Sequence, residues 1–497
     1  MAAGEVRRCT GCRAPLSQYN AGTRCGACSR DTRLAAAPQL WASAQFAEAM
    51  AKWDLGAVLR LYRMHTGARQ VTLAAAFNVD QSVISRVENG RRGIADRRQI
   101  LEFTQKLGVP DSLLPALPAQ DEELFQVNAL WMPSVDEVLS RLGALTGTDV
   151  NVRVADIVAD AGPESVIEVL RAWADDSRAG EAARAGRTGQ RVGPADVQTL
   201  SIMSEAFADT DHRLGGGHAR RTLAHYLSTV AIPLAAVGKY NDHVGQLLFT
   251  QIARLADVAG FMAFDAGHQN LARYYLTYGL RLAKAAENRV LAAHILTDLS
   301  MQALHINHPD SAVASAQAAV DAAAKDCFPL TLARCHAIAA RACAAANDPV
   351  ASDRHLVQAE LLLDRRGDVQ EPQWVSFFSV RQLTVEAMYA SHALGRTTYV
   401  QRHADAAHLD QAAADAMPRR DVLANTTLAM SYLQPGHADV ERACAIMTTC
   451  LPLIGRLTSA RALAAIEQTR RRLADFSTNA AVKDLDAAFA HADAVDS

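Results

Sequence analysis

The stretch QVTLAAAFNVDQSVISRVENGRR, residues 70–92, decides the fold of the N-terminal part of the chain. Apolar side chains recur at helical spacing over residues 70–77 and again over residues 81–89, which predicts two short helices. Asp80 is a favourable N-cap for the second helix, and Gly90 is a favourable residue for ending it. The stretch therefore predicts two helices joined by a tight turn.

Helical spacing continues on both sides of this stretch. Apolar residues over 55–62 predict a preceding helix, residues 95–107 a following one, and Val109-Pro110-Asp111 the start of a short fifth helix. Five short helices with a tight turn between the second and third are typical of a helix-turn-helix domain. We assign residues 38–117 to such a domain.

The residues in register here resemble a known family. The matching pieces are Gln70-x2-Leu73-Ala74, Asn78-Val79-Asp80-Gln81-Ser82 and Ile84-Ser85-Arg86-x-Glu88-x-Gly90-x-Arg92. Over about 60 residues they resemble the lambda-repressor-like, xenobiotic-response-element (XRE) family of bacterial and phage DNA-binding domains. The resemblance implies a partly buried ion pair between Arg63 and Glu88 that ties the first helix to the third.

Such a domain reads DNA with its third helix. That helix enters the major groove with its N-terminal end first, so Gln81 and Ser82 are expected to reach base edges. Arg86 lies one turn further and can read guanine through its two-pronged guanidinium group. Phosphate contacts are expected from the remaining polar residues nearby: Gln70, Ser85, Asn89, Arg91 and Arg92. The alternative is that Gln81 and Arg86 are ordinary surface residues.

The net charge of −3 hides an uneven distribution. Residues 1–98 hold 15 Lys/Arg and 7 Asp/Glu, a net +8, which leaves −11 for the rest of the chain. A basic end on an acidic body favours a polyanion such as double-stranded DNA as partner. Chance clustering of arginines on a solvated face remains the alternative.

The cysteines are also unevenly placed. Cys9, Cys12, Cys25 and Cys28 form a C-x2-C-x12-C-x2-C pattern, and the other five lie between residues 327 and 450 in helical patterns. Four thiolates on two tight turns complete a closed tetrahedral site, so we expect a structural Zn²⁺ in a ribbon over residues 1–34. Two disulfides or four free thiols are the alternative. The five other cysteines are expected to be small buried side chains.

Helical patterns dominate the remaining chain, because alanine is abundant and strand-forming residues are sparse. From residue 195 to 497, breaks recur at Gly267, Asn307, Asn347, Gly395 and Gly436, which lie 40, 40, 48 and 41 residues apart. Paired helices at a period of this size predict an α-solenoid. The unit from Ala259 to Ala283 resembles a tetratricopeptide (TPR) repeat, although the units are longer than the usual ~34 residues. A bundle of unrelated helices is the alternative.

A solenoid of this kind has a concave face built from the first helices of its hairpins. The candidates for ligand contacts on that face are polar residues at helical positions: Gln251, Arg254, His294, Asp298, Trp374 and Arg381. Residues 118–194 are predicted to be a helical linker, with a mobile loop over 180–193. The solenoid is also expected to form a homodimer, because two heads are needed to bind two half-sites.

Other functional classes lack supporting residues. The chain contains no G-x4-G-K-[ST], H-E-x-x-H or G-x-S-x-G motif and no dinucleotide fingerprint, so we do not expect an enzyme. Its N-terminus has no signal-peptide pattern, and its apolar runs fall short of the roughly 18–20 residues of a membrane helix. We therefore expect a cytoplasmic protein without a membrane partner.

The favoured hypothesis is an all-α, sequence-specific transcription regulator whose TPR-like domain senses a small ligand, peptide or protein. The architecture resembles bacterial XRE regulators with C-terminal TPR-like domains, including peptide-sensing quorum regulators. The second hypothesis is a TPR-type interaction scaffold with weak, nonspecific nucleic-acid binding. A zinc-dependent hydrolase is the least favoured.

Overall fold

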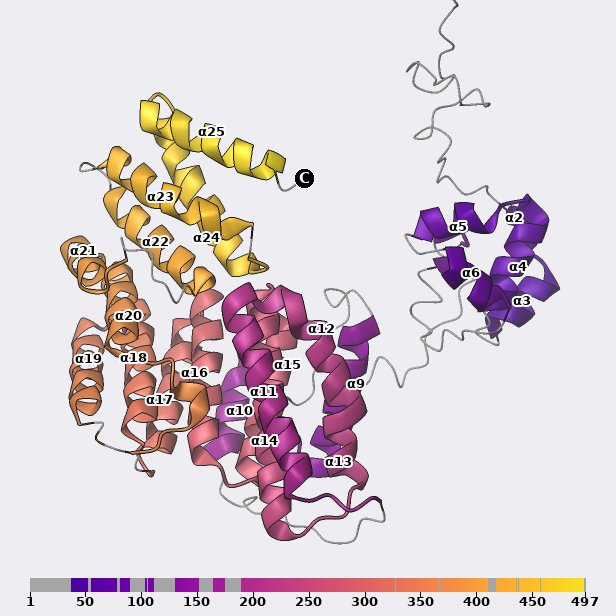
Figure 1. Ribbon diagram of the computed structural model, residues 1–497, viewed down its shortest axis with the longest axis horizontal. Helices are drawn as coiled ribbons and strands as arrows, with labels where there is room; N and C mark the ends of the chain where they lie inside the picture. Colours follow the sequence, from indigo (N-terminus) through magenta and orange to yellow (C-terminus); the bar gives the residue numbers. More distant parts are fainter. Residues whose placement is uncertain are drawn as a thin grey trace, which may run out of the picture. The chain divides into compact units, whose positions relative to one another are not determined.

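The computed structural model describes residues 37–51, 55–77, 81–89, 103–104, 106–110, 130–151, 164–174, 189–326, 328–365, 367, 369–409, 417–434, 436, 438–455 and 457–495. Within these ranges the regular structure is helical, and the one β pairing is an isolated bridge between Arg191 and Lys239. The chain divides into two compact units, Met1–Leu124 and Phe125–Ser497 (Figure 1). We call them the N-terminal unit and the helical domain.

The N-terminal unit is a cluster of short helices around an aromatic core. Its described helices are α2 (Pro38–Trp41), α3 (Ala44–Ala51), α4 (Leu55–Thr66), α5 (Gln70–Phe77) and α6 (Gln81–Glu88). The ring of Trp41 stacks on Tyr62 with centroids 5.7 Å apart, and Phe77 meets Phe103 edge-on at 4.5 Å. Since Leu59, Leu73 and Ile84 are also buried there, α4, α5 and α6 share one core. The three central helices predicted from the sequence are confirmed.

Several sequence predictions for this unit lie outside the described residues. They include the zinc ribbon with its four cysteines, the turn at Asn78-Val79-Asp80, and most of the predicted fourth and fifth helices. Gly90, Arg91 and Arg92 also lie outside the described part of the chain.

The helical domain contains two groups of helices. Its first part comprises α9 (Val135–Asn151), α10 (Glu164–Ala174), α11 (Pro194–Leu214), α12 (Gly216–Tyr226), the π-helical turn η5 (Leu227–Ala231) and α13 (Ile232–Val237). Its second part comprises α14 (Asp242–Asp265), α15 (Gln269–Ala285), α16 (Arg289–His305), α17 (Pro309–Ala323), α18 (Pro329–Ala345), α19 (Pro349–Asp364), η6 (Gln373–Val375), α20 (Val380–Ala393), α21 (Thr397–Ala406), α22 (Pro418–Tyr432), α23 (Val440–Ile454), α24 (Ala460–Leu473), η7 (Ala474–Phe476) and α25 (Ala480–Val495).

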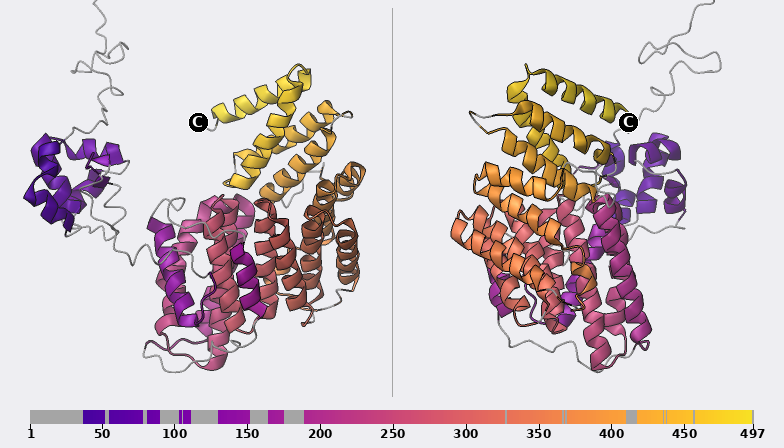
Figure 2. Two further views of the ribbon diagram at one scale, coloured as in Figure 1. Left: turned by 180° about the vertical axis from the view of Figure 1, so that it is seen from behind. Right: turned by 60° about the vertical axis from the view of Figure 1, so that its left-hand side comes forward.

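Helices from α14 to α23 pair along the chain as hairpins. Each even-numbered helix packs against the next one, as in α14 with α15 and α22 with α23. The first helices also pack on one another in a row, α14 on α16, α16 on α18, α18 on α20, α20 on α22, and α22 on α24. Figure 2 shows this row following the colour gradient of the chain from magenta to yellow. A continuous inner layer therefore consists of the first helices.

The breaks identified in the sequence are helix ends in the structure. Gly267, Asn307, Asn347, Gly395 and Gly436 all have positive φ, between 59° and 88°. After α14, the amide of Gly267 donates to Phe264 and that of His268 to Ala263, the two hydrogen bonds of a Schellman cap. The same pair of bonds ends α16, α18 and α20. Glycine and asparagine recur at these positions because they tolerate the left-handed conformation.

Residues 130–151 and 164–174 differ from the linker predicted for 118–194. Both α9 and α10 pack on the helical domain, and Asp149 of α9 is fully buried against Arg220 and Tyr275. Lys284 of α15 donates to the carbonyl oxygens of Ala172 and Trp173, at 3.1 and 2.8 Å. These helices lack the repeat pattern, but their apolar faces need a core to cover them. Most of the loop predicted over 180–193 lies outside the described residues.

One helix in the described part of the chain, α14, is long and apolar enough to cross a membrane. Its apolar window is 83% buried inside the helical domain, between α11, α12, α15 and α16. It has the features of the central helix of a packed core.

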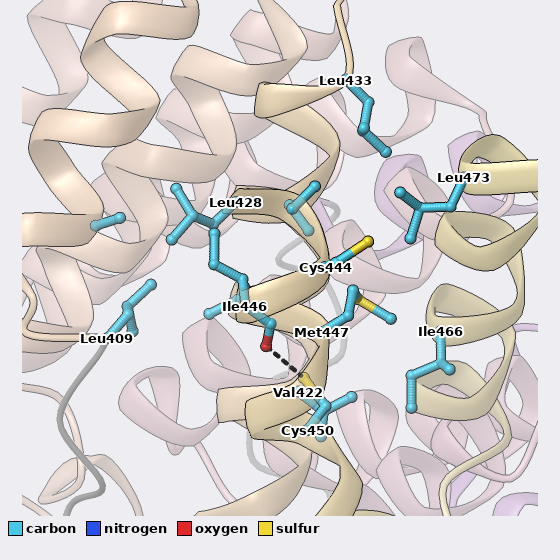
Figure 3. Close-up of a cluster of buried hydrophobic side chains, with 14 of the residues drawn as sticks. Leu409, Val422, Leu428, Leu433, Cys444, Ile446, Met447, Cys450, Ile466 and Leu473 are labelled. Atoms are coloured by element: carbon cyan, nitrogen blue, oxygen red, sulfur yellow. Dashed lines mark hydrogen bonds between the residues drawn. The ribbon is translucent and has the colours of Figure 1, made fainter. Parts of the chain in front are cut away.

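A second buried cluster joins α22, α23 and α24 near the C-terminal end of the domain. Figure 3 shows Met447, Ile466 and Leu473 meeting across these helices. Cys444 and Cys450 lie in this cluster as buried free thiols, and the Cys450 Sγ donates to the Ile446 carbonyl at 3.9 Å. Cys335 and Cys343 are also free and buried, as predicted for the cysteines of the helical patterns, whereas Cys327 lies outside the described residues.

Candidate DNA-binding surface and helical-domain cavity

Helix α6 has one buried face and one exposed face. Ile84 and Val87 are 1% and 4% exposed, and the half-buried Val83 packs on the same core. Gln81, Arg86 and Asn89 are exposed. The face that does not enter the core therefore carries polar side chains able to donate to DNA.

A hydrogen-bonded network links this face to the rest of the unit. The buried Glu88 carboxylate accepts from Arg63 Nη1 at 2.6 Å and from Gln70 Nε2 at 2.7 Å. Gln81 Nε2 in turn donates to Gln70 Oε1 at 2.6 Å. The predicted Arg63–Glu88 ion pair is thus present, and Gln70 connects it to Gln81. This network holds the start of α5 and both ends of α6 in register.

Three other predicted DNA contacts lie within the described residues: Ser85, Gln70 and Ser82. Ser85 is half-buried, and its Oγ lies 3.5 Å from Asn89 Nδ2. Gln70 is half-buried, and its amide already bonds Glu88 and Gln81. The backbone of Ser82 belongs to α6, one residue after Gln81.

The helical domain contains a cavity of about 400 Å³ along its inner layer of helices. Its walls come from α11, from η6 and the residues after it, and from α14, α16, α18, α20, α22 and α24. The first helices of successive hairpins thus face one internal space. Pockets that hold small molecules usually have volumes of roughly 300–1,000 Å³.

Charged side chains form a chain across one wall of the cavity. Arg254 Nη1 is 2.5 Å from Asp257 Oδ2, and Arg334 Nη2 is 2.5 Å from Asp298 Oδ1. The ring of His294 lies between the two arginines, with Nε2 3.3 Å from Arg254 and Nδ1 3.2 Å from Arg334. All five side chains are buried.

This environment changes the pKa values of two side chains, His294 and Asp257. Burial lowers the pKa of His294 well below its usual value, and the charges of Arg334 and Arg254 lower it further. Burial also raises the pKa of Asp257 to about 7, with a further increase from Asp298. His294 is therefore neutral at pH 7.

Asp257, His294 and Asp298 each place one ligand atom within 4.8 Å of the others, a spacing that suits a metal ion. However, each carboxylate already accepts a short hydrogen bond from a guanidinium group. A cation here would lie beside the guanidinium groups of Arg254 and Arg334, so the arrangement favours internal ion pairs over metal binding.

Another group of arginines lines the opposite part of the cavity. Arg419 donates to both oxygens of Asp211, at 3.0 and 2.9 Å, and lies 3.1 Å from Asp265. Arg341 Nη1 is 2.8 Å from Glu386. Burial alone would raise the pKa of Asp265, but Arg419 and the neighbouring Arg461 lower it below its usual value.

Two further arginines have only longer contacts with carboxylates. Arg420 Nε lies 3.6 Å from Asp421 Oδ1, and its Nη1 donates to Gln382 Oε1 at 3.3 Å. Arg461 Nη1 comes no closer than 3.8 Å to Asp265, and its Nε and Nη1 atoms are buried without a hydrogen bond. Its guanidinium carbon lies 3.9 Å from the Phe264 ring centroid. Burial lowers the pKa of Arg461 to about 10, and the charges of Arg419 and Arg341 add to this effect. Arg420 also has a buried Nε without a hydrogen bond.

Four of the six predicted ligand contacts line the cavity: Arg254, His294, Asp298 and Trp374. Gln251, one helical turn before Arg254, does not line it. Arg381 does not either, because it donates to the Ala407 carbonyl at 2.9 Å and lies 3.6 Å from Asp421.

Sequence reasoning missed most of the charged lining: Asp211, Asp257, Arg334, Arg341, Glu386, Arg419, Arg420 and Arg461. One signal could have identified some of them. Arg254, His294 and Arg334 are 40 residues apart, the same spacing as the first breaks, and so occupy equivalent positions on successive first helices.

Residues 54–117 match a family model described as a helix-turn-helix domain. The chain matches none of the curated proteins and none of the solved structures with which it was compared. The match covers α4, α5 and α6, the helices that carry the exposed polar face. It indicates a DNA-binding regulator.

Proposed function

We propose that the protein is a cytoplasmic, sequence-specific transcription regulator whose helical domain senses a small ligand, peptide or protein partner. The observation that carries the proposal is the exposed polar face of α6, within the residues that match a helix-turn-helix domain. Gln81 and Arg86 on that face suit base edges, while Arg91 and Arg92 suit phosphates. The row of hairpins, with capped ends about 40 residues apart, supports a TPR-like solenoid as the sensing domain.

Selection from random duplexes with the full chain, followed by binding titrations, tests this proposal. A regulator binds its selected sequence about 10³-fold or more tighter than unrelated duplexes at the same salt concentration. Equal binding to all sequences would contradict it and favour the interaction scaffold.

The proposal includes one structural Zn²⁺ per chain, bound by Cys9, Cys12, Cys25 and Cys28. The support is the spacing of these cysteines. Metal analysis of protein purified without added zinc is expected to give about one equivalent, because a closed site of four thiolates retains its metal. A content below about 0.2 equivalents in folded protein would contradict the zinc site.

The proposal also includes a homodimer formed through the helical domain. Val350, Val357 and Leu361 form an apolar stripe on α19, and they are 76%, 51% and 40% exposed. A second copy is the occupant we expect, since two linked heads convert weak half-site binding into tight operator binding.

Light scattering on the full chain tests the dimer. We expect a dimeric mass for the unmodified protein and a monomeric mass for Val357→Lys. The matched control is Gln358→Lys at the adjacent exposed position, which should remain dimeric. The monomeric variant should bind its operator at least about tenfold more weakly, because the gain in effective concentration is lost. A monomeric unmodified protein would exclude this dimer.

A further inference from the structure

The unpaired polar atoms of the cavity are mainly hydrogen-bond donors. Among the described lining residues, the buried atoms without a hydrogen bond are Trp374 Nε1, Arg420 Nε, Arg461 Nε and Nη1, and Asp257 Oδ1. All but the last are donors. A buried donor without a partner costs free energy, and a bound acceptor removes that cost. The cavity therefore suits a ligand rich in acceptor oxygens.

The charges of the lining point to the same kind of ligand. Six arginines line the cavity, but only four carboxylates do so: Asp211, Asp257, Asp298 and Glu386. Each of these carboxylates pairs with one arginine, namely Arg419, Arg254, Arg334 and Arg341 in that order. Arg420 and Arg461 have longer contacts with carboxylates that are not part of the lining, Asp421 at 3.6 Å and Asp265 at 3.8 Å. Guanidinium groups held by such long contacts keep N–H donors that an anionic ligand can accept from.

Three of the arginines affect the same side chain, Tyr389. The guanidinium carbon of Arg341 lies 4.4 Å from the Tyr389 ring centroid. Burial raises the pKa of Tyr389, while the positive charges of Arg341, Arg461 and Arg420 act in the opposite direction. Arg341 on α18, Arg420 on α22 and Arg461 on α24 all line the cavity together with Tyr389.

Aromatic rings supply the rest of a binding site. Phe261, Trp374 and Phe377 line the same cavity, and Arg419 lies over the Phe261 ring at 5.0 Å. An apolar or aromatic body can pack against these rings while a charged group reaches the arginines.

We propose that the cavity binds a small organic anion, with its carboxylate or phosphate group between Arg461 and Arg420 and its apolar body against Phe261 and Trp374. The guanidinium group matches the geometry of both oxyanions through paired N–H donors. The inference that the cavity binds an anion depends only on the residues of the cavity. The inference that this binding changes DNA affinity also rests on the proposed function.

Calorimetry on the full chain tests the proposal with three probes of one shape: 2-naphthoate, 2-naphthyl phosphate and neutral 2-naphthamide. We expect at least one anion to bind at least about tenfold tighter than the amide, because only the anions can form an ion pair with Arg461. The tighter of the two anions identifies carboxylate or phosphate as the preferred group. Equal affinities for all three probes, or no anion binding up to about 1 mM, would overturn the proposal.

The variant Arg461→Gln links binding to the site. It should bind the better anion at least about tenfold more weakly. The matched control is Arg471→Gln on the same helix, whose side chain is 78% exposed and pairs with Glu467 outside the cavity. It should bind like the unmodified protein, and an unchanged affinity in Arg461→Gln would overturn the proposal.

Unfolding in urea separates a binding role from a structural one. Arg461 is a buried charge without a hydrogen bond at Nε and Nη1, and its carboxylate partner Asp265 is 3.8 Å away, so Arg461→Gln without ligand should unfold at the same or a higher urea concentration. A markedly lower midpoint would identify Arg461 as structural and overturn the assignment.

The proposed function and this inference fail separately. Anion binding by a protein without sequence preference for DNA would leave the cavity site standing and contradict the regulator. Sequence-specific DNA binding without anion binding would do the reverse.

Discussion

The N-terminal unit and the helical domain both bury a carboxylate beside an arginine, but they direct their remaining donors differently. In the N-terminal unit, Arg63 and Gln70 both donate to Glu88 Oε2, while Gln81 and Arg86 extend from α6 to the surface. In the helical domain, the unsatisfied guanidinium groups of Arg420 and Arg461 lie inside a cavity. Donors on an exposed helix suit a long polyanion, whereas enclosed donors suit a small anion.

This difference predicts how strongly each charged group affects stability. An exposed donor can be solvated by water, so its removal changes binding more than folding. A buried ion pair loses much more when one partner is removed, because the other charge stays in a medium of low polarity. The predictions below follow from this contrast.

The largest effect is expected for Arg419→Met in the helical domain. This change removes the guanidinium group that contacts Asp211 and Asp265, which are 4% and 0% exposed. Asp211 then loses its buried ion-pair partner, and Asp265 keeps only the more distant Arg461 as a charged partner, so the free energy of unfolding should fall by about 3–5 kcal/mol. Urea unfolding followed by circular dichroism measures it.

Arg213→Ala on α11 is the control for this variant. Arg213 and Asp209 pair at 2.9 Å but are 72% and 61% exposed. Their loss should change the free energy of unfolding by less than about 0.5 kcal/mol. Similar losses in both variants would show that burial does not set the contribution of these pairs.

Arg63→Ala in the N-terminal unit should have a smaller effect. Its partner Glu88 is 4% exposed, but the Arg63 side chain is 31% exposed and water screens part of the pair. Gln70 also continues to donate to the carboxylate. We expect a loss of about 2 kcal/mol in local stability, seen as faster hydrogen exchange over residues 55–88. Arg69→Ala, at an exposed position in the same unit, should leave exchange unchanged.

The two regions also differ in how much of their structure could be predicted from the sequence. In the N-terminal unit, the resemblance to a known family predicted the helices around Gln81 and the Arg63–Glu88 pair. These residues lie within about 25 positions of one another, so their spacing fixes the geometry. The hairpins of the helical domain followed from breaks such as Asn307 and Asn347, because left-handed helix ends restrict residue type.

The cavity was only partly predictable. Arg254 and His294 were identified because they are polar residues at regular positions on apolar helices. Arg419 was not, because its partner Asp211 is 208 residues away and no local pattern reflects that pairing. The packing of α9 was missed for a similar reason, since Asp149 meets Arg220 71 residues later.

Substitutions in and after α6 should change DNA binding more than stability. Gln81→Ala and Arg86→Ala are each expected to weaken operator binding by about 1–3 kcal/mol and to leave nonspecific binding nearly intact. Arg91→Ala should weaken binding to every duplex and reduce the salt dependence by about one unit of slope. Fluorescence anisotropy at several salt concentrations measures both. Identical behaviour of the three variants would contradict the division into base and phosphate contacts.

The smallest effect concerns pH and the neutral histidine of the cavity. The pKa of His294 is lowered by burial and by Arg334 and Arg254, so the folded state excludes a proton that the unfolded chain accepts below about pH 6.5. The stability that depends on neutral His294 is complete above that pH and is lost as the pH falls. Burial likewise lowers the pKa of His212 to about 4. Asp257 acts in the opposite direction, because burial raises its pKa to about 7 and the folded state retains its proton.

Replacing His294 isolates its share of this balance. Between pH 6 and 5, the free energy of unfolding of His294→Gln should decrease less steeply than that of the unmodified protein, by about 1 kcal/mol per pH unit for one proton. His243→Gln, at an exposed histidine of α14, should follow the unmodified profile. Urea unfolding at several pH values measures the difference. Parallel profiles for His294→Gln and the unmodified protein would mean that His294 takes up its proton in the folded state, with Asp257 and Asp298 able to stabilise it against the two arginines.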